Sequence, residues 1–156
     1  MTISGLPAHV LVVHAAVVLI PLSCLLAIGF AVLPDWRWLS RWPTAAAAVG
    51  SVVLAYLATT TGGSLERSRQ LQRFVVLHAQ RGHLLAQLTI VLAVVAVAAA
   101  VLVPGRSGLA SGKGAVGARL PYVDKVLPVL LIIAAVVVIV QTVLTGDSGA
   151  RAVWGQ

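Results

Sequence analysis

The chain has 156 residues, of which 60% are apolar and only 10% are charged, and its mean hydropathy is +1.02. So little charge cannot cover the surface of a soluble globular domain, and the length leaves no room for a soluble catalytic domain beside a membrane bundle. The net charge of +7 is spread between hydrophobic segments, so it favours anionic lipid headgroups over nucleic acid as the partner.

Four segments contain no Asp, Glu, Lys or Arg, and each is longer than the roughly 20 residues that cross a bilayer as a helix. With Pro and Gly as boundary signals, we predict helices over residues 7–33, 43–62, 74–103 and 122–145. Residues 1–156 would then form a single transmembrane domain. The expected fold is an all-α, up-down-up-down four-helix membrane bundle with both termini on the same side.

The connections carry their own signals. Trp36, Trp38 and Trp42 follow the first predicted helix and are typical of an aromatic belt at headgroup level. Residues 104–121 are rich in glycine and predict a flexible loop. The N-terminus has no Lys or Arg ahead of its apolar run, so we expect it to be retained rather than cleaved as a signal peptide. Cys24 is the single cysteine, which excludes an intramolecular disulfide.

The distribution of basic residues bears on orientation. Six basic residues fall on the side of the tryptophan connection and the glycine-rich loop, namely Arg37, Arg41, Arg106, Lys113, Arg119 and Lys125. Five fall on the side of the termini, namely Arg67, Arg69, Arg73, Arg81 and Arg151. Because cytoplasmic loops carry the excess of Lys and Arg, this balance favours a multi-pass protein of the inner membrane with both termini outside.

Uncharged polar residues gather toward one end of the predicted bundle. All four histidines lie in the first turns of the first and third predicted helices. At similar depth fall Thr59, Thr60, Thr61, Gln80, Gln87, Gln141, Thr142 and Thr145. Polar groups in hydrocarbon must find partners, so the clustering predicts a polar site in the half of the bundle nearer the termini.

Helical geometry separates the histidines. His9 and His14, like His78 and His83, are five residues apart, about 140° around a helix, so neither pair is a same-face chelating pair. On the third helix His83 shares a stripe with Gln80 and Gln87, which favours His83 for the interior. On the first helix the same reasoning favours His14 for the interior and places His9 on a different face, near the interface.

One histidine from each of two helices, at matching depth, can hold a haem iron between them. The preferred ligands are therefore His14 and His83, with His9 and His78 as less favoured ligands, and the cofactor would be haem b. Arg73 and Arg81 lie where the propionates would need cationic partners. Two alternatives stay open: a different metal or proton-linked role, and histidines that serve only as hydrogen-bonded packing residues.

Two short segments resemble a known family. They are Gly5-Leu6-Pro7-Ala8-His9 with the following Val13-His14, and the terminal segment from Thr145 to Gly155. Together with the four spans they resemble a bacterial integral-membrane family called domain of unknown function 2231. The resemblance covers essentially the whole chain and implies histidines at His9 and His14 and at His78 or His83. Asp147 stands where the family often has histidine, which argues against a ligand role for the C-terminal segment.

Some members of that family look like membrane modules joined to redox domains, which favours electron transfer. The sequence thus predicts a small b-type cytochrome-like protein, an electron carrier rather than an enzyme. The alternative is a non-catalytic accessory or scaffold subunit of a larger membrane or respiratory complex.

Overall fold

Four long helices form the protein in the computed structural model, which describes residues 2–3, 6–69, 72–117 and 120–154, with side chains described over 9–63, 76–117 and 120–151. The helices are α1 (Ala8–Val32), α2 (Arg37–Arg69), α3 (Gln72–Leu102) and α4 (Val123–Trp154). A short 3₁₀ turn, η1 (Pro34–Trp36), joins α1 to α2. Ahead of α1, strands β1 (Thr2–Ile3) and β2 (Leu6–Pro7) pair antiparallel, with Ile3 opposite Leu6.

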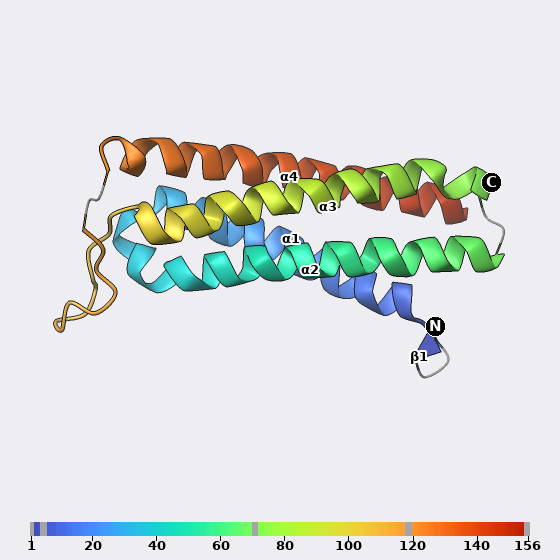
Figure 1. Ribbon diagram of the computed structural model, residues 1–156, viewed down its shortest axis with the longest axis horizontal. Helices are drawn as coiled ribbons and strands as arrows, with labels where there is room; N and C mark the ends of the chain where they lie inside the picture. Colours follow the sequence, from blue (N-terminus) through green and yellow to red (C-terminus); the bar gives the residue numbers. More distant parts are fainter. Residues whose placement is uncertain (1, 4–5, 70–71, 118–119, 155–156) are drawn as a thin grey trace.

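The helices run alternately in opposite directions (Figure 1), and their contacts close them into a ring. Each packs against its neighbours in sequence, and α1 also packs against α4. All four contain a segment long and apolar enough to cross a membrane, at His9–Val32, Pro34–Gly63, Val76–Leu102 and Val123–Arg151. The expected four-helix membrane bundle is confirmed.

The two ends of the bundle differ in what they carry. Both chain termini lie at one end, together with the end of α2 and the start of α3 (Figure 1). We call this the histidine end because all four histidines lie near it. The opposite end holds η1 and the glycine-rich connection from α3 to α4, and we call it the loop end.

The helix bounds extend beyond the proline and glycine signals. α2 begins at Arg37 rather than at Pro43, so Trp38 and Trp42 are helical, and it continues past Gly62 to Arg69. α4 likewise continues past Gly146 to Trp154. In hydrocarbon a helix satisfies its own backbone groups, so continuing it costs less than exposing them at a break. Neither glycine ends its helix here.

Small residues fill the middle of the bundle. Ala27, Ala48, Ala96 and Ala135, one from each helix, are almost completely buried. Small side chains let helix backbones approach closely, which is the main source of packing energy between helices in lipid.

Two polar contacts join α1 to α2 within this packing. The hydroxyl of Ser51 donates to that of Ser23 at 3.1 Å, and Thr44 Oγ1 donates to the Leu26 carbonyl at 3.2 Å. Such hydrogen bonds between helices satisfy polar groups that hydrocarbon cannot.

Two buried arginines close the loop end. Arg41 is only 2% exposed and donates to the carbonyls of Ala100 and Val103 at the end of α3. Arg37 donates to the carbonyls of Phe30 and Ala31 at the end of α1, each at 3.2 Å. The last carbonyls of a helix have no partner within it and carry partial negative charge, so guanidinium groups suit them well. α2 thus caps both of its neighbours.

The glycine-rich connection is tied to the bundle. Gly105 and Val116 exchange two backbone hydrogen bonds, of 3.0 and 2.9 Å. A Cβ atom at Gly108 would lie 2.7 Å from Cε2 of Trp38, so this part of the connection passes directly against the indole ring. These contacts hold the segment that we expected to be flexible over the start of α2.

We predict that Arg41→Met destabilises the folded protein by about 1–3 kcal/mol, since the carbonyls of Ala100 and Val103 lose their donor. Unfolding of the purified protein in detergent, followed by circular dichroism against temperature, measures the effect. Arg106→Met is the control, because Arg106 is exposed on the loop. Equal melting temperatures for the two variants would contradict the capping role.

Candidate functional site

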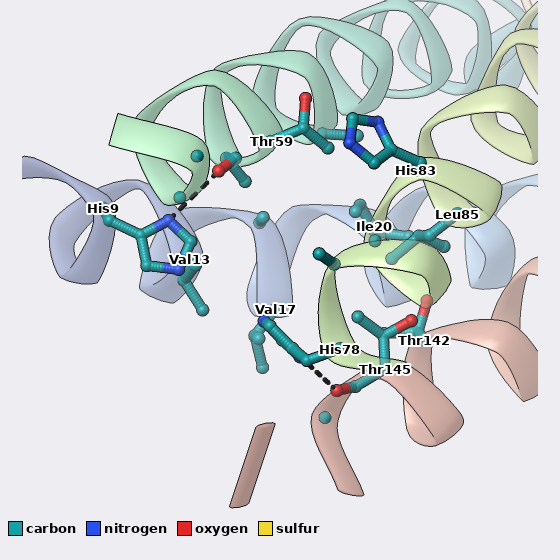
Figure 2. Close-up of a pocket in the computed structure, with 18 residues that line it drawn as sticks. His9, Val13, Val17, Ile20, Thr59, His78, His83, Leu85, Thr142 and Thr145 are labelled. Carbon is teal, nitrogen blue, oxygen red and sulfur yellow. Dashed lines mark hydrogen bonds between the residues drawn. The ribbon is translucent and has the colours of Figure 1, made fainter. Parts of the chain in front are cut away.

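A cavity of about 220 Å³ lies at the histidine end, with walls contributed by all four helices (Figure 2). Apolar side chains such as Val13, Ile20 and Leu85 form much of its lining. Residues with small or no side chains leave the space open, namely Ala16, Ala55, Ala58, Gly62, Gly63, Ala79, Gly82 and Gly146. Three histidines line it: His9, His78 and His83.

His9, in the first turn of α1, reaches across to α2. Its Nδ1 lies 3.1 Å from the Ala58 carbonyl oxygen and 3.3 Å from Thr61 Oγ1. A carbonyl can only accept, so Nδ1 carries the proton and donates. The ring also lies directly against Gly62, where a Cβ atom would come within 3.0 Å of its Cε1. The Nε2 atom of His9 therefore keeps its lone pair.

His78, near the start of α3, makes the corresponding contacts with α4. Its Nδ1 donates to the Thr145 carbonyl at 3.0 Å (Figure 2), and Ser148 Oγ lies 3.4 Å away. The ring lies against Gly149, where a Cβ atom would come within 3.0 Å of its Nδ1. The Nε2 lone pair of His78 is free in the same way.

The other two histidines are more exposed. His14 does not line the cavity, and its Nδ1 donates to the Val10 carbonyl of its own helix at 2.6 Å. His83 lines the cavity but its side chain is exposed, and it lies away from His9 and His78 in Figure 2. The structure thus brings His9, His78 and His83 to one cavity and leaves His14 outside it.

The helical-wheel argument about which faces point inward was wrong for most of its residues, although His83 does line the cavity. On α3, the predicted interior stripe of Gln80, His83 and Gln87 is exposed, whereas Leu85 and Thr89 are buried. Near a membrane interface polar side chains reach water and headgroups without facing inward, and the bundle buries its apolar and small residues. The same reason places His14 outside and His9 inside.

The two arginines proposed as propionate partners are placed differently. Arg81 is tied to α4: its Nη1 donates to the Leu144 carbonyl at 2.7 Å and lies 4.0 Å from Asp147 Oδ2. Gln141 Nε2 in turn donates to the Arg81 carbonyl at 3.0 Å. The side chain of Arg73 lies outside the described residues.

Sequence reasoning missed the residues that hold the imidazoles. Gly62 and Gly146 were interpreted as helix ends, Thr61 was expected only as one member of the polar cluster, and Ser148 and Gly149 received no role in the site. The available signal was a shared pattern, a Thr or Ser followed directly by Gly at 61–62 and at 148–149. This pattern could be interpreted only if the helix that each histidine contacts were known, and a helical wheel does not predict contacts between helices.

Fold and cavity together define a class: a four-helix integral membrane protein whose first and third helices present imidazoles to one cavity near a bundle end. Within that class, the chain belongs to the family described as "Predicted membrane protein (DUF2231)", whose model matches residues 5–156. The resemblance noted in the sequence is therefore confirmed. No curated protein and no solved structure matches the chain.

Proposed function

We propose that the protein is a small b-type cytochrome-like electron carrier that holds haem b at the histidine end, between α1 and α3. The observation that carries the proposal is the pair of imidazoles of His9 and His78, from these two helices, at one cavity. Each has its Nδ1–H fixed on a backbone carbonyl of another helix. A histidine that binds iron through Nε2 needs this type of support to fix its tautomer and ring orientation.

The donor set suits a haem iron better than a bare metal ion. Among the described residues, no group of three or more His, Cys, Asp or Glu side chains comes together as a metal site. A structural or catalytic zinc ion takes at least three protein ligands, whereas a porphyrin supplies four nitrogens and leaves two axial positions for imidazoles. The apolar walls also suit a macrocycle.

The cavity volume sets a condition on binding. Its size of about 220 Å³ is below the roughly 300–1,000 Å³ of ligand pockets, so a porphyrin must widen it. The first turns of α1 form one wall and lie apart from α4 in Figure 1. We propose that these turns move outward when haem binds. Arg81, with Arg73, stays the proposed partner of the propionates.

Bound haem would supply one-electron chemistry at its iron, and the protein would tune it without making or breaking bonds. The redox partner would then be another component of the bacterial inner membrane, or the protein would work inside a larger membrane complex. On orientation, the six basic residues on the loop side against five on the other favour a cytoplasmic loop end.

We predict that protein produced with ample haem shows a Soret band and, after dithionite, an α band. His9→Ala and His78→Ala should each abolish the bis-histidine spectrum, because each removes one axial ligand. Visible spectroscopy of the purified variants is the measurement.

His14→Ala is the matched control and should keep the spectrum, because His14 lies outside the cavity. Loss of the bands in His14→Ala and their persistence in His9→Ala would return the ligand role to the pair favoured by the helical wheel, His14 and His83. Wild-type protein without any band would contradict the haem proposal and leave the accessory-subunit interpretation.

For orientation, Ser111→Cys at the loop end and Ala150→Cys at the histidine end form a matched pair, since both positions are exposed. A membrane-impermeant maleimide added to spheroplasts should label Ala150→Cys and spare Ser111→Cys. Wild-type protein is the blank, because Cys24 is completely buried. The reverse labelling pattern would place the loop end outside.

A further inference from the structure

The contacts of His9 and His78 repeat with the same spacing along two different helices. His9 meets a carbonyl at position 58, a hydroxyl at 61 and a glycine at 62 of α2. His78 meets a carbonyl at 145, a hydroxyl at 148 and a glycine at 149 of α4. In both sets the hydroxyl follows the carbonyl by one turn of helix and the glycine comes next. We call each set a histidine clamp.

The two clamps also agree in their dimensions. The Nδ1-to-carbonyl distances are 3.1 and 3.0 Å, and the Nδ1-to-hydroxyl distances are 3.3 and 3.4 Å. In each clamp the hydroxyl also lies within hydrogen-bond distance of the carbonyl that accepts from the imidazole, at 3.2 Å for Thr61 and 2.8 Å for Ser148, and Thr61 Oγ1 has a closer acceptor in the Leu57 carbonyl, at 2.7 Å. A Cβ atom on either glycine would come within 3.0 Å of the ring.

Burial along the helices follows the same repeat. When α1 is aligned with α3 so that His9 corresponds to His78, every buried residue of α1 corresponds to a buried residue of α3. The buried residues of α1 are Ala16, Ile20, Ser23, Cys24, Ala27, Phe30 and Ala31, and their counterparts are Leu85, Thr89, Leu92, Ala93, Ala96, Ala99 and Ala100. Two buried helices can always be aligned so that some buried positions match, but here the two histidines set the alignment independently of burial.

Helices α2 and α4 can be aligned in the same way through their own clamps, so that Ala58 corresponds to Thr145. Four of the seven buried positions of α2 then fall on buried positions of α4: Arg41 on Pro128, Thr44 on Leu131, Ala48 on Ala135 and Ser51 on Val138. The other three, Arg37, Ala45 and Ala55, fall on Asp124, Ile132 and Thr142, which are not buried. The repeat unit is therefore a helical hairpin, present once as α1–α2 and once as α3–α4. Each hairpin carries one clamp.

We propose that the protein is an internal duplication of this hairpin, and that Thr61–Gly62 and Ser148–Gly149 are equivalent positioning residues that present His9 and His78 as matched ligands of one group. In the ring of helices, α1 has the same position relative to α2 as α3 has relative to α4. The two hairpins are therefore related by a pseudo-twofold axis along the bundle. Membrane proteins built from parallel repeats have such an axis along the membrane normal, with binding sites at the repeat interface.

A group held at such an axis meets two equivalent imidazoles, one from each hairpin. The chemical class that this suits is a metal centre with two like coordination positions. In naming haem iron as that centre the inference rests on the proposed function, whereas the duplication and the clamps do not.

The two glycines are important for the position of the imidazoles because each packs directly against one ring, Gly62 against His9 and Gly149 against His78. At the distances given above, a methyl group at Gly62 or Gly149 requires the imidazole to shift by a few tenths of an ångström. We expect such a shift to weaken the hydrogen bond between the Nδ1–H and its carbonyl and to change the orientation of Nε2. Partners that orient a metal-binding histidine in this way typically contribute 10- to 100-fold to metal affinity.

The first test reads the tautomers without any cofactor. In a His14→Gln/His83→Gln background only His9 and His78 remain, and nitrogen-15 NMR of the histidine-labelled protein in detergent should show both rings protonated at Nδ1. Adding Gly62→Ala should change the signals of one ring, and adding Gly149→Ala those of the other. Gly29→Ala is the matched control, since a Cβ atom there meets nothing within 4 Å.

The second test titrates hemin into the otherwise wild-type protein with either glycine replaced. Each variant should bind hemin 10- to 100-fold more weakly than wild type, and the two should agree within a few-fold. If either alanine variant fails to fold, Thr61→Val and Ser148→Ala remove the clamp hydroxyls instead and should weaken binding equally. An effect in one hairpin alone, or Nε2-protonated rings, would overturn the proposal.

The two tests separate this inference from the proposed function. If both rings are protonated at Nδ1 in the His14→Gln/His83→Gln background and wild-type protein has no affinity for hemin, haem is refuted as the ligand but the clamps are supported. Hemin binding that neither glycine variant weakens refutes the clamps while the proposed function stands.

Discussion

The bundle depends on side chains that donate hydrogen bonds to backbone carbonyls of a neighbouring helix. At the loop end, Arg37 and Arg41 of α2 bond the carboxyl ends of α1 and α3. At the histidine end, His9 bonds α2, and His78 and Arg81 bond α4. Between these two levels the helices meet mainly through small residues. Lipid competes for none of these bonds, so they fix which helices are neighbours and at what depth.

This division explains why the cavity lies where it does. In the middle of the bundle, alanines such as Ala48 and Ala135 let the helices pack closely and leave little space. Toward the histidine end, glycines face imidazole rings, as at Gly62 and Gly149, or open space, as at Gly82 and Gly146. The imidazoles that join the helices there through Nδ1 keep the lone pair of Nε2, so the contacts that stabilise this end also orient the proposed ligands.

The sequence predicts the fold and the end of the bundle that holds the site, because both follow from where charged and polar residues occur along the chain. Four charge-free segments are enough to define four spans, and the family match supports that interpretation. The direction of each histidine could not be predicted. A helical wheel assumes that polar residues face inward, and near a membrane interface that assumption fails, as His14 and Gln80 show.

Contacts between helices were equally hidden from the sequence. Gly62 has the usual signature of a helix end, yet it lies within α2, and the imidazole of His9 lies where a side chain at this position would be. Arg41, next to a tryptophan, has the signature of an interfacial cation, yet it is buried on the carbonyls of α3. In both cases the residue type is explained by a helix distant in sequence.

The two hairpins differ where they meet the membrane surface, although most of their buried positions agree. At the histidine end, residues 9–20 and 55–63 of the first hairpin carry no charge. At the corresponding positions the second hairpin carries Arg81 and Asp147, whose Nη1 and Oδ2 atoms lie 4.0 Å apart. A pseudo-symmetric site offers a ligand two equivalent faces, so this charge difference is what distinguishes the two sides. A charged partner or a charged ligand substituent therefore interacts with charged side chains on α3 and α4 but not on the corresponding parts of α1 and α2.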